Sequence, residues 1–549
     1  MTKIFSIILI ALAILSFSSL AVAQVPEVHA SGATMNLDVS VQSDHSALAT
    51  HADITATTWI TVNSTMDDFN DGNSKTCLND SPCTLRRAIN QAYPLTAPDR
   101  PVAIIFDIPI TDTGYLPALG AWKITLTGTT AHALRELNGQ TILDGSTQPG
   151  GRSDGPKIIV NGDGHKNYGL ILRNDQNEVR GIAMQDFLEA HISISSDSNK
   201  VEDCWFGLSD DGTTLSSGSD TDPEGGGGIS FAAGSDNNEV LNNVLAGFYQ
   251  VAIAVRGDGN KVSANWIGMR ADGTVPLPGG YDQHPCEGAS WTGGVAMTVS
   301  DNNNTIGGSM PGDGNIMAGL YLQTTDQSPA MDVIGSGHVI ENNVIGLDAQ
   351  DTVVGVCGRG LDFGGGPHGM LVRDNTIVET GLSAILMNSS SLNGNTLRSN
   401  IIRRATEWPP AQGMNPFPED AIAYGPFVPD ALRTFTPAQV TEISGTVIQG
   451  TSGAGSPCPT CTVELFLDDK DSVTEALRSL GVVTADANGD WSFTLTASLE
   501  SGQGLRTMST VPDSFTIIGL DAGTTSNLSV LYARYEAFLP LVTREVTTK

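Results

Sequence analysis

Aspartates in glycine-containing loops are the first candidates for chemistry in this 549-residue chain. Asp211, Asp272 and Asp348 recur at similar places in separate loops, and carboxylate oxygens are ligands that Ca²⁺ prefers in proteins. Asp and Gly are also typical of tight turns, because Asp hydrogen-bonds to nearby backbone and Gly accepts a positive φ. The turn interpretation is favoured. We therefore expect no cofactor, with a structural Ca²⁺ held by these three aspartates as the alternative.

Two tryptophans are candidates for carbohydrate binding. Trp205 and Trp266 occupy equivalent positions in two copies of a repeat, and each precedes an apolar residue that should point inward. Neighbouring side chains of a strand point to opposite faces, so both indoles should face outward. Exposed aromatic faces suit stacking on sugar rings. We predict a carbohydrate-binding platform here, and the alternative is that the segment 209–228 folds over the indoles.

Glycoside hydrolysis generally needs two facing carboxylates, and the sequence predicts no such pair. Alternation along the expected strands gives outward positions without an acid, which are His191, Ser193, Ser195, Ser230, Ala252, Ala254, Arg256, Ala296, Thr298, Tyr321, Gln323, Leu386 and Asn388. No catalytic residue is therefore assigned. Two or more acids beside a basic residue on this face, around Arg256, would instead favour an enzyme.

These candidates lie within a repeated pattern, Asn-x-Val-x-x-Asn-x-Ile or a near variant, which occurs in eight stretches. The pattern advances by 22 residues from Asn177 to Asn199, and by the same step from Asn238 to Asn260. A period in the low twenties with short apolar runs and polar corners is typical of a solenoid. We predict an all-β fold with a parallel β-helix over 101–405, right-handed because parallel crossovers almost always are.

The corner of each repeat carries an asparagine that we interpret as structural. Stacked side-chain amides can hydrogen-bond along the axis of a solenoid, as in the amide ladders of cross-β structures. Cys204 takes this position in one repeat and should be buried. The predicted ladder consists of Asn243, Asn265, Asn343, Asn375 and Asn400.

The amino-terminal residues and the composition indicate export. Residues 1–23 combine Lys3, an apolar run and Ala21-Val22-Ala23, as in a secretory signal peptide. Residues 24–57 should form a flexible lead-in, and no other run has the length of a membrane span. The net charge of −32 argues against nucleic acid and anionic lipid as partners. A secreted or cell-surface protein that contacts polysaccharide or other surface components is favoured.

Seven cysteines in an exported chain predict disulfides with one thiol left over. Cys77 and Cys83 should close one short loop, and Cys458 and Cys461 another. Cys286 and Cys357 lie in irregular segments and form a tentative third pair. Cys204 is then the free, buried cysteine. Zinc is the alternative ligand for the two close pairs, but they are far apart in the sequence.

The segments outside the repeats suggest caps and a second domain. Residues 58–100 should cap the coil with a helix over 84–92, because its apolar residues share one helical face and Thr84 can serve as N-cap. Long excursions at 209–228, 271–294 and 348–367 should line one side. The proline-rich segment 406–439 is interpreted as a linker or a cover for the end of the coil. Alternating runs over 440–533 predict an Ig-like β-sandwich with a hairpin turn at Asn488-Gly489, followed by a tail at 534–549.

Several motifs resemble those of secreted bacterial β-helix proteins that begin with a CSLREP domain. Cys83-Thr84-Leu85-Arg86-Arg87 is similar to their Cys-Ser-Leu-Arg-Glu motif, with Arg87 in place of the usual Glu. The segments 141–150, 265–274 and 304–308 resemble other parts of these proteins. The resemblance covers about residues 58–405. It implies an exported surface protein with the fold of a superfamily that also contains pectate lyases and polygalacturonases.

Together these features predict a non-enzymatic exported protein that uses the side of a β-helix to hold glycans or partner surfaces. The alternative is a polysaccharide lyase or glycoside hydrolase that acts on an acidic polysaccharide from the loop-lined face.

Overall fold

The structure of the protein is a computed structural model. It describes residues 55–128, 134–216, 227–248, 251–275, 295–320, 329–390, 394–406, 420–452, 458–471, 473–513 and 519–533. The expected signal peptide, most of the lead-in, Cys286 and the tail lie outside these residues. Among the described residues, no helix is long and apolar enough to cross a membrane.

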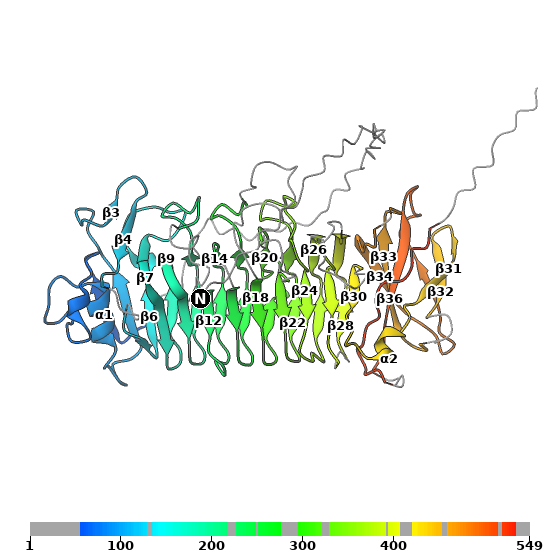
Figure 1. The fold of residues 1–549 in the computed structure, drawn as a ribbon, viewed down its shortest axis with the longest axis horizontal. Coiled ribbons are helices and arrows are strands. Elements are labelled where there is room, and N and C mark those ends of the chain that lie inside the picture. Colours follow the sequence, from blue (N-terminus) through cyan, green and yellow to red (C-terminus); the bar gives the residue numbers. More distant parts are fainter. Residues whose placement is uncertain are drawn as a thin grey trace, which may run out of the picture. The chain divides into compact units, whose positions relative to one another are not determined.

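A parallel β-helix with three sheets forms most of the described chain, and its rungs follow one another along the axis (Figure 1). The first sheet is parallel throughout. Its eleven strands are, in spatial order, β1 (Thr58–Val62), β2 (Val102–Phe106), β6 (Thr141–Asp144), β8 (Glu178–Arg180), β10 (Lys200–Glu202), β13 (Glu239–Leu241), β16 (Lys261–Ser263), β19 (Thr305–Gly307), β22 (Val339–Glu341), β25 (Leu371–Arg373) and β28 (Thr396–Arg398).

The second and third sheets are joined because two long strands, β7 (Ile158–Arg173) and β9 (Ile182–Ile194), bend through both. The second sheet also contains β4 (Ala121–Thr125), β11 (Trp205–Phe206), β14 (Val244–Leu245), β17 (Trp266–Ile267), β20 (Ile316–Met317), β23 (Val344–Ile345), β26 (Thr376–Thr380) and β29 (Ile401–Ala405). The third sheet also contains β5 (Leu137–Asn138), β12 (Gly227–Phe231), β15 (Val251–Val255), β18 (Val295–Val299), β21 (Met331–Val333), β24 (Leu361–Phe363), β27 (Ile385–Met387) and β30 (Ile422–Tyr424).

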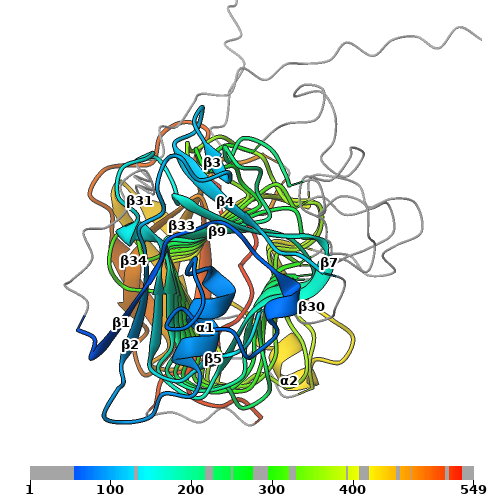
Figure 2. The same cartoon turned by 90° about the vertical axis from the view of Figure 1, so that its left-hand side faces the viewer.

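The core lies inside the coil, which Figure 2 shows in the view along its axis. Each rung contributes apolar side chains from all three sheets, for example Val262, Ile267 and Met297, which are fully buried. Alternation along each short strand places these residues inside and polar residues outside. A single rung cannot bury its apolar side alone, so the stacking of neighbours stabilises the fold.

Two amide ladders fix the corners of the coil. The predicted ladder is confirmed: Asn243 Nδ2 donates to Asn265 Oδ1 at 3.0 Å, and Asn343 Nδ2 donates to Asn375 Oδ1 at 3.0 Å. Asn315, which the prediction omitted, stands between Asn265 and Asn343 with bonds of 2.9 Å to each. The backbone N–H of Cys204 donates to Asn243 Oδ1, so Cys204 does occupy the corner of its rung.

The second ladder runs on the other side of the first sheet, through Asn177, Asn199, Asn238, Asn260 and Asn304 to His338. The residue before a ladder position has a positive φ in most rungs, for example 57° at Asn242 and 58° at Asn342. Asn, Asp and Gly tolerate this left-handed conformation better than other residues do. Polar residues and glycine therefore precede most ladder residues, and Ala264, before Asn265, is an exception with a φ of 59°.

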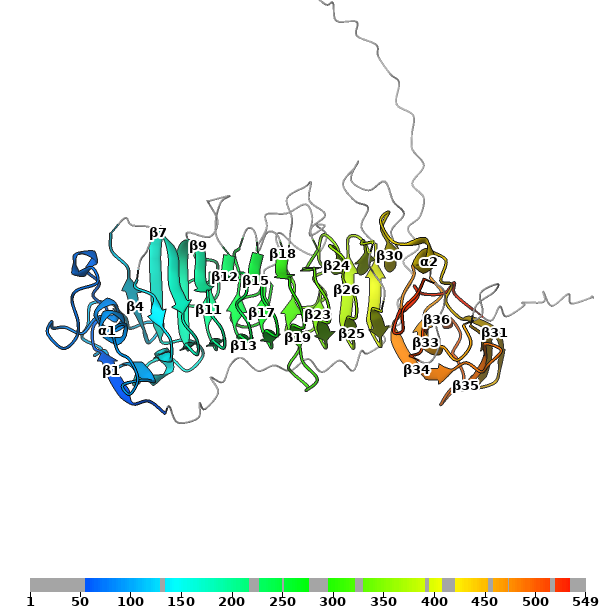
Figure 3. The same cartoon turned by 90° about the horizontal axis from the view of Figure 1, so that it is seen from below.

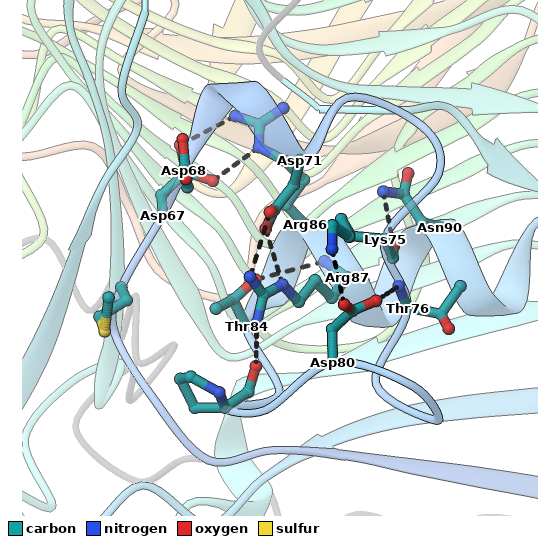
Figure 4. Close-up of polar contacts among 12 residues, drawn as sticks. Asp67, Asp68, Asp71, Lys75, Thr76, Asp80, Thr84, Arg86, Arg87 and Asn90 are labelled. Atoms are coloured by element: carbon teal, nitrogen blue, oxygen red, sulfur yellow. Dashed lines mark hydrogen bonds and ion pairs between the residues drawn. The ribbon is translucent and has the colours of Figure 1, made fainter.

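A cap covers the first rung. The helix α1 (Leu85–Ala92) begins after Thr84, whose hydroxyl accepts from Arg87 N–H at 3.3 Å, as predicted. Its apolar side chains join the core of the coil, and Figure 2 shows α1 across the end. Two ion pairs hold the preceding loop and the short helix η1 (Phe69–Asp71) against α1 (Figure 4). In these pairs Arg86 Nε lies 2.7 Å from Asp67 Oδ1, and Arg87 Nε lies 2.7 Å from Asp71 Oδ2.

Two smaller features complete the first rungs. A second short helix, η2 (Gly145–Thr147), follows β6, and Asp144 caps it through a 2.9 Å bond from Ser146 N–H. The strand β3 (Tyr115–Leu116) pairs with β4 and is antiparallel.

The coil extends beyond the predicted boundary at residue 405. The strand β30 (Ile422–Tyr424) pairs in parallel with β27 and forms a last rung within the segment expected to be a linker. The short helix α2 (Asp430–Arg433) follows it. Proline content suggested a linker or an end cover, but Ala421 and Ile422 are buried in the core of the coil, so this part of the segment belongs to the coil itself.

The carboxyl-terminal module is a small β-sandwich, visible after the last rungs in Figure 3. One antiparallel sheet contains β31 (Gln439–Ser444), β32 (Val447–Thr451) and β35 (Asp490–Thr494). The other contains β34 (Arg478–Thr484), β33 (Thr462–Asp468) and β36 (Gly504–Thr510). They enclose a separate apolar core that includes Trp491 and Leu465.

The turn at Asn488-Gly489 exists, but it does not form the predicted hairpin. Asp486 N–H donates to Asp490 O at 2.8 Å and closes the turn, and Asp486 Oδ1 accepts from Asn488 N–H at 2.7 Å. The strands on either side, β34 and β35, belong to different sheets. The turn therefore joins the two strands in sequence only. β34 pairs with β33 and β35 pairs with β32, on opposite sides of the sandwich core.

Candidate functional site

The long excursions leave the coil at one corner. The segments between β11 and β12, between β17 and β18, and between β23 and β24 all connect the second sheet to the third. The predicted one-sided arrangement is therefore present. The third excursion is shorter than the expected 348–367, because β24 (Leu361–Phe363) already belongs to the third sheet.

The outer face of the third sheet, beside this corner, carries a continuous row of side chains. Their inner neighbours, such as Ile229, Met297 and Leu361, are fully buried in the core, so alternation places the row outside. Strand pairing aligns the row from one rung to the next in the order Ser193, Ser230, Ala254, Thr298, Asp332, Asp362 and Leu386.

Two acids in this row lie side by side, which the sequence analysis missed. Asp332 and Asp362 are register partners in β21 and β24, so their backbones are about 4.8 Å apart. The prediction had assigned Tyr321 and Gln323 to this rung, but both lie outside the described residues. The sequence does carry a signal, which is the pattern apolar-Asp-apolar in Met331–Val333 and Leu361–Phe363. In a strand this pattern places the Asp on the outer face, because its two neighbours point inward.

The environments of the two acids differ. Partial burial raises the pKa of Asp332, although a hydrogen bond from the Val333 backbone opposes this shift. Asp362 Oδ2 lies 3.6 Å from Nη1 of Arg359, a residue that is only 8% exposed. Two carboxylates therefore lie on neighbouring rungs of the outer face, and one of them pairs with a guanidinium, that of Arg359 instead of Arg256. Arg256 itself is exposed and forms no ion pair with any described residue.

His191 is not on the outer face, contrary to the prediction. It is 3% exposed and packs edge-on against Phe187, Phe206 and Phe248, with ring centroids 5.3, 6.1 and 5.2 Å away. Burial lowers its pKa to about 4. The strand β9 bends at this point. The residue that pairs with His191 is Gly228, which has no side chain to displace Phe248. The imidazole of His191 can therefore pack among the phenylalanines.

The prediction of an exposed tryptophan platform is wrong for this structure. Trp205 and Trp266 point away from the coil core as expected, but they are only 7% and 5% exposed. Gly212 lies over the Trp205 ring, the guanidinium of Arg152 lies 4.8 Å from it, and Gly273 lies over Trp266. The indoles form a second apolar cluster beneath the loops, because large aromatic surfaces are stabilised by burial.

The three aspartates predicted as the calcium alternative cap their own turns. Asp211 Oδ1 accepts from Thr213 N–H at 3.1 Å, Asp272 Oδ1 from Thr274 N–H at 2.9 Å, and Asp348 Oδ1 from Gln350 N–H at 2.9 Å. Their loops stack on one another through backbone bonds from Ala271 to Gly212 and from Ala349 to Gly273. These contacts explain the repeated Asp as turn chemistry, the favoured interpretation, and cation binding by the three residues stays an untested alternative.

A group of acids in the carboxyl-terminal module has better spacing for a cation. Ligand atoms of Asp468, Asp469, Asp471 and Glu475 lie within 4.8 Å of one another. Asp468 is already ion-paired with Arg506, and Glu475 Oε1 accepts from the backbone N–H of Arg404 at 2.8 Å. We assign no cation to this group, because existing donors already satisfy its two buried members.

The cysteine predictions are confirmed where the structure describes both partners. Cys77 pairs with Cys83 and Cys458 with Cys461. Cys204 is a free thiol that is fully buried, and burial raises its pKa. The pairing of Cys286 with Cys357 stays a prediction, because Cys286 lies outside the described residues.

Comparison with known proteins gives only distant structural likenesses. No family model and no curated protein matches the chain. The A-module of the mannuronan C-5 epimerase AlgE6 from Azotobacter vinelandii is 10% identical, with a TM-score of 0.26, over 63% of this chain and 93% of that chain. A mutant tailspike protein of E. coli bacteriophage HK620 in complex with a pentasaccharide is 12% identical, with a TM-score of 0.25, over 74% of each chain. A DFA-IIIase mutant from Arthrobacter chlorophenolicus A6 is 11% identical, with a TM-score of 0.16, over 56% and 83%. At these values the likenesses carry no argument about function, and the β-helix assignment rests on the strand pairing of this chain.

Proposed function

We propose that this protein is exported and binds polysaccharide along the outer face of its third sheet. The in-register row from Ser193 to Asp362 is the observation that carries this proposal. Its hydroxyls and carboxylates occur on five of six neighbouring rungs, interrupted by Ala254, so one extended glycan can contact several rungs at once. Repeated weak contacts of this kind add to a useful affinity without a deep pocket.

Export is supported by two observations. The pairs Cys77–Cys83 and Cys458–Cys461 are at disulfide distance, and disulfides persist mainly outside the cytosol. Residues 1–23 have the composition of a signal peptide. The carboxyl-terminal β-sandwich would then serve as a spacer or attachment module at the cell surface.

The binding proposal is tested on the mature chain with a panel of neutral and acidic polysaccharides. Thr298 lies in the row, and Thr305 occupies an outer position of the first sheet, away from it. We expect Thr298→Arg to weaken binding at least about tenfold by blocking the row, a change of about 1.4 kcal/mol, and the matched Thr305→Arg to leave it unchanged. Equal affinity of the two variants would refute binding on this face.

The second candidate function is cleavage of a polysaccharide by a hydrolase or lyase mechanism, favoured by the pairing of Asp332 with Asp362. Glycosidases use one protonated and one ionised carboxyl group, and the raised pKa of Asp332 suits the role of general acid. Asp362, ion-paired with Arg359, would act as base or nucleophile. A lyase would use the same groups for proton transfer.

Catalysis is tested by incubating the mature chain with the panel in the presence of calcium and measuring new reducing ends or unsaturated products. Asp332→Asn and Asp362→Asn should each reduce the rate at least about 100-fold. Asp374→Asn is the control, since Asp374 also lies beside an arginine, Arg373, but is exposed and stands at a corner where Asn is well tolerated. Absence of product from every polymer rules out the enzyme on this panel and leaves the binding proposal standing.

A further inference from the structure

A cavity of about 390 Å³ lies outside the second sheet, near the beginning of the coil. It is on a different face from the row described above, between β4 and the loop that follows β11. Its volume is within the range of pockets that hold small ligands. Residues of two kinds line it: charged and polar groups, including Lys123, Asp210 and Gln185, and two leucines, Leu119 and Leu215.

The loop that forms the rim, 208–216, is held in place at several points. Leu208 and Leu215 form an antiparallel bridge, and Ser209 N–H donates to Thr214 O at 2.8 Å. Arg152 Nη1 donates to Asp210 O at 2.5 Å, so the loop is also tied to the neighbouring rung. A rim that is already ordered loses little entropy when a ligand binds.

The floor of the cavity is fixed by buried hydrogen bonds. Gln185 is 1% exposed, donates from Nε2 to Leu208 O at 2.8 Å, and accepts from Asn161 Nδ2 at 3.2 Å. Asn161 Nδ2 also donates to Asp186 Oδ2 at 2.6 Å. These polar groups are therefore oriented before any ligand arrives.

The rim retains groups that a ligand can reach. Lys123 Nζ lies 2.8 Å from Asp210 Oδ1, and their side chains are 27% and 29% exposed. An exposed pair of this kind contributes little to stability, so it can exchange contacts with a ligand at small cost. It offers an ammonium donor and a carboxylate acceptor at one point, which suits adjacent hydroxyl groups of a sugar.

The charge of the lining restricts the ligand. Asp186, Asp210 and Asp211 provide three carboxylates, against the ammonium of Lys123 and the guanidinium of Arg152 at the rim. The net charge is therefore negative, and a uronate would be repelled. Leu119 and Leu215 add apolar surface that fits the C–H face of a pyranose. From this combination we propose that the cavity binds a neutral sugar unit of a polysaccharide and rejects uronate-rich chains. This inference rests on the proposed function, because it assumes that the ligand of the protein is a glycan, but it concerns a different site.

The test measures binding of the mature chain to neutral gluco-, manno-, xylo- and galacto-oligosaccharides and to oligogalacturonate by calorimetry. We expect a neutral oligosaccharide to bind and oligogalacturonate to bind at least about tenfold more weakly. Lys123→Gln and Asp210→Asn should each weaken neutral binding by about tenfold or more, and Thr214→Trp, which fills the cavity, should abolish it.

Matched controls separate a pocket defect from a folding defect. Lys200→Gln removes an ion-paired lysine of the first sheet, and Asp272→Asn alters an equivalent Asp-Gly turn that does not line the cavity. Both should bind like the wild type, with unchanged thermal unfolding midpoints in all variants used. Unaltered binding in Lys123→Gln and Thr214→Trp, preferred binding of oligogalacturonate, or no binding of any neutral oligosaccharide overturns the proposal.

The row on the third sheet is tested separately with Thr298→Arg. Binding that is lost in Thr298→Arg but retained in the cavity variants overturns the cavity proposal and leaves the proposed function. Binding that is lost in the cavity variants but retained in Thr298→Arg supports the cavity proposal and refutes glycan binding along the row.

Discussion

Asn265 Nδ2 donates to Asn315 Oδ1 at 2.9 Å, although the two residues are 50 positions apart in the sequence. An excursion of the chain lies between them, yet the ladder continues without a gap. Asn315 is fully buried and also bonds to Asn343 Oδ1 and to Val262 O, both at 2.9 Å. The ladder therefore depends on spatial stacking of the corners, and the number of residues in between is unimportant.

Asn315→Ala should destabilise the coil. The change leaves the buried backbone N–H of Asn265 without its acceptor and removes the bonds that Asn315 Nδ2 donates to Val262 O and Asn343 Oδ1. A buried group left unsatisfied costs about 1–3 kcal/mol. We expect a loss of at least about 2 kcal/mol in the free energy of unfolding, measured by urea titration followed by circular dichroism. Asn73→Ala, at an exposed position in the cap, is the control and should change stability by less than about 0.5 kcal/mol. Similar midpoints for both variants would contradict the structural role of the ladder.

Arg87→Met should loosen the cap more than Lys75→Met does. The side chains of Arg87 and Asp71 are 14% and 5% exposed, and removal of Arg87 leaves Asp71 as a buried charge without its partner. Breaking such a pair costs about 3–5 kcal/mol. Lys75 and Asp80 form a more exposed pair, at 49% and 20%, whose contribution to stability should be small. Thermal unfolding and limited proteolysis between residues 55 and 100 measure the difference, and equal effects would show that the Arg87 pair is not structural.

Stability should fall as the pH decreases from about 6.5 to about 4, because of His191. Its pKa is lowered from 6.5 to about 4 by burial, so the unfolded chain binds the proton first in this range. The effect is absent above the unfolded pKa and complete below the folded one. His191→Leu removes the titrating group, and its unfolding midpoint should depend less on pH in this window than that of the wild type. Parallel pH profiles of the two proteins would exclude His191 as the source.

Glu475 should act in the opposite direction at higher pH. Burial, together with Asp469 and Asp471, raises its pKa to about 7 from an ordinary value of 4.5, so the folded state holds the proton more tightly. Stability is then lost as the pH rises from about 4.5 to about 7. Glu475→Gln keeps an oxygen for the Arg404 N–H and should stabilise the protein above pH 7 by up to about 3 kcal/mol, with no gain below pH 4.5. A stabilisation that does not change with pH would disprove this assignment.

The sequence predicted the fold in considerable detail because a solenoid repeats one local pattern of strand, corner and strand. The spacing of Asn243 and Asn265 identifies the corners, and the apolar residues around them identify the strands. Thr84 and the apolar face of α1 were readable for the same reason, since helix capping and amphipathic patterns are local properties. The strand β30 was missed because prolines nearby obscured a short apolar run whose packing partner is distant in sequence.

The candidate site was less predictable, and the reason is geometric. Asp332 and Asp362 were each visible in the sequence, but excursions of unequal length separate them, so counting residues could not align their rungs. Trp205 and Trp266 were placed correctly on the outside, but the position of Gly212 and Gly273 over the rings depends on how the loops stack. The sequence by itself determined the repeating unit, because strand alternation and corner amides act over a few residues. Only the tertiary structure decided which outward side chains meet and which are covered, because hydrogen bonds between rungs set the register across intervening loops of any length.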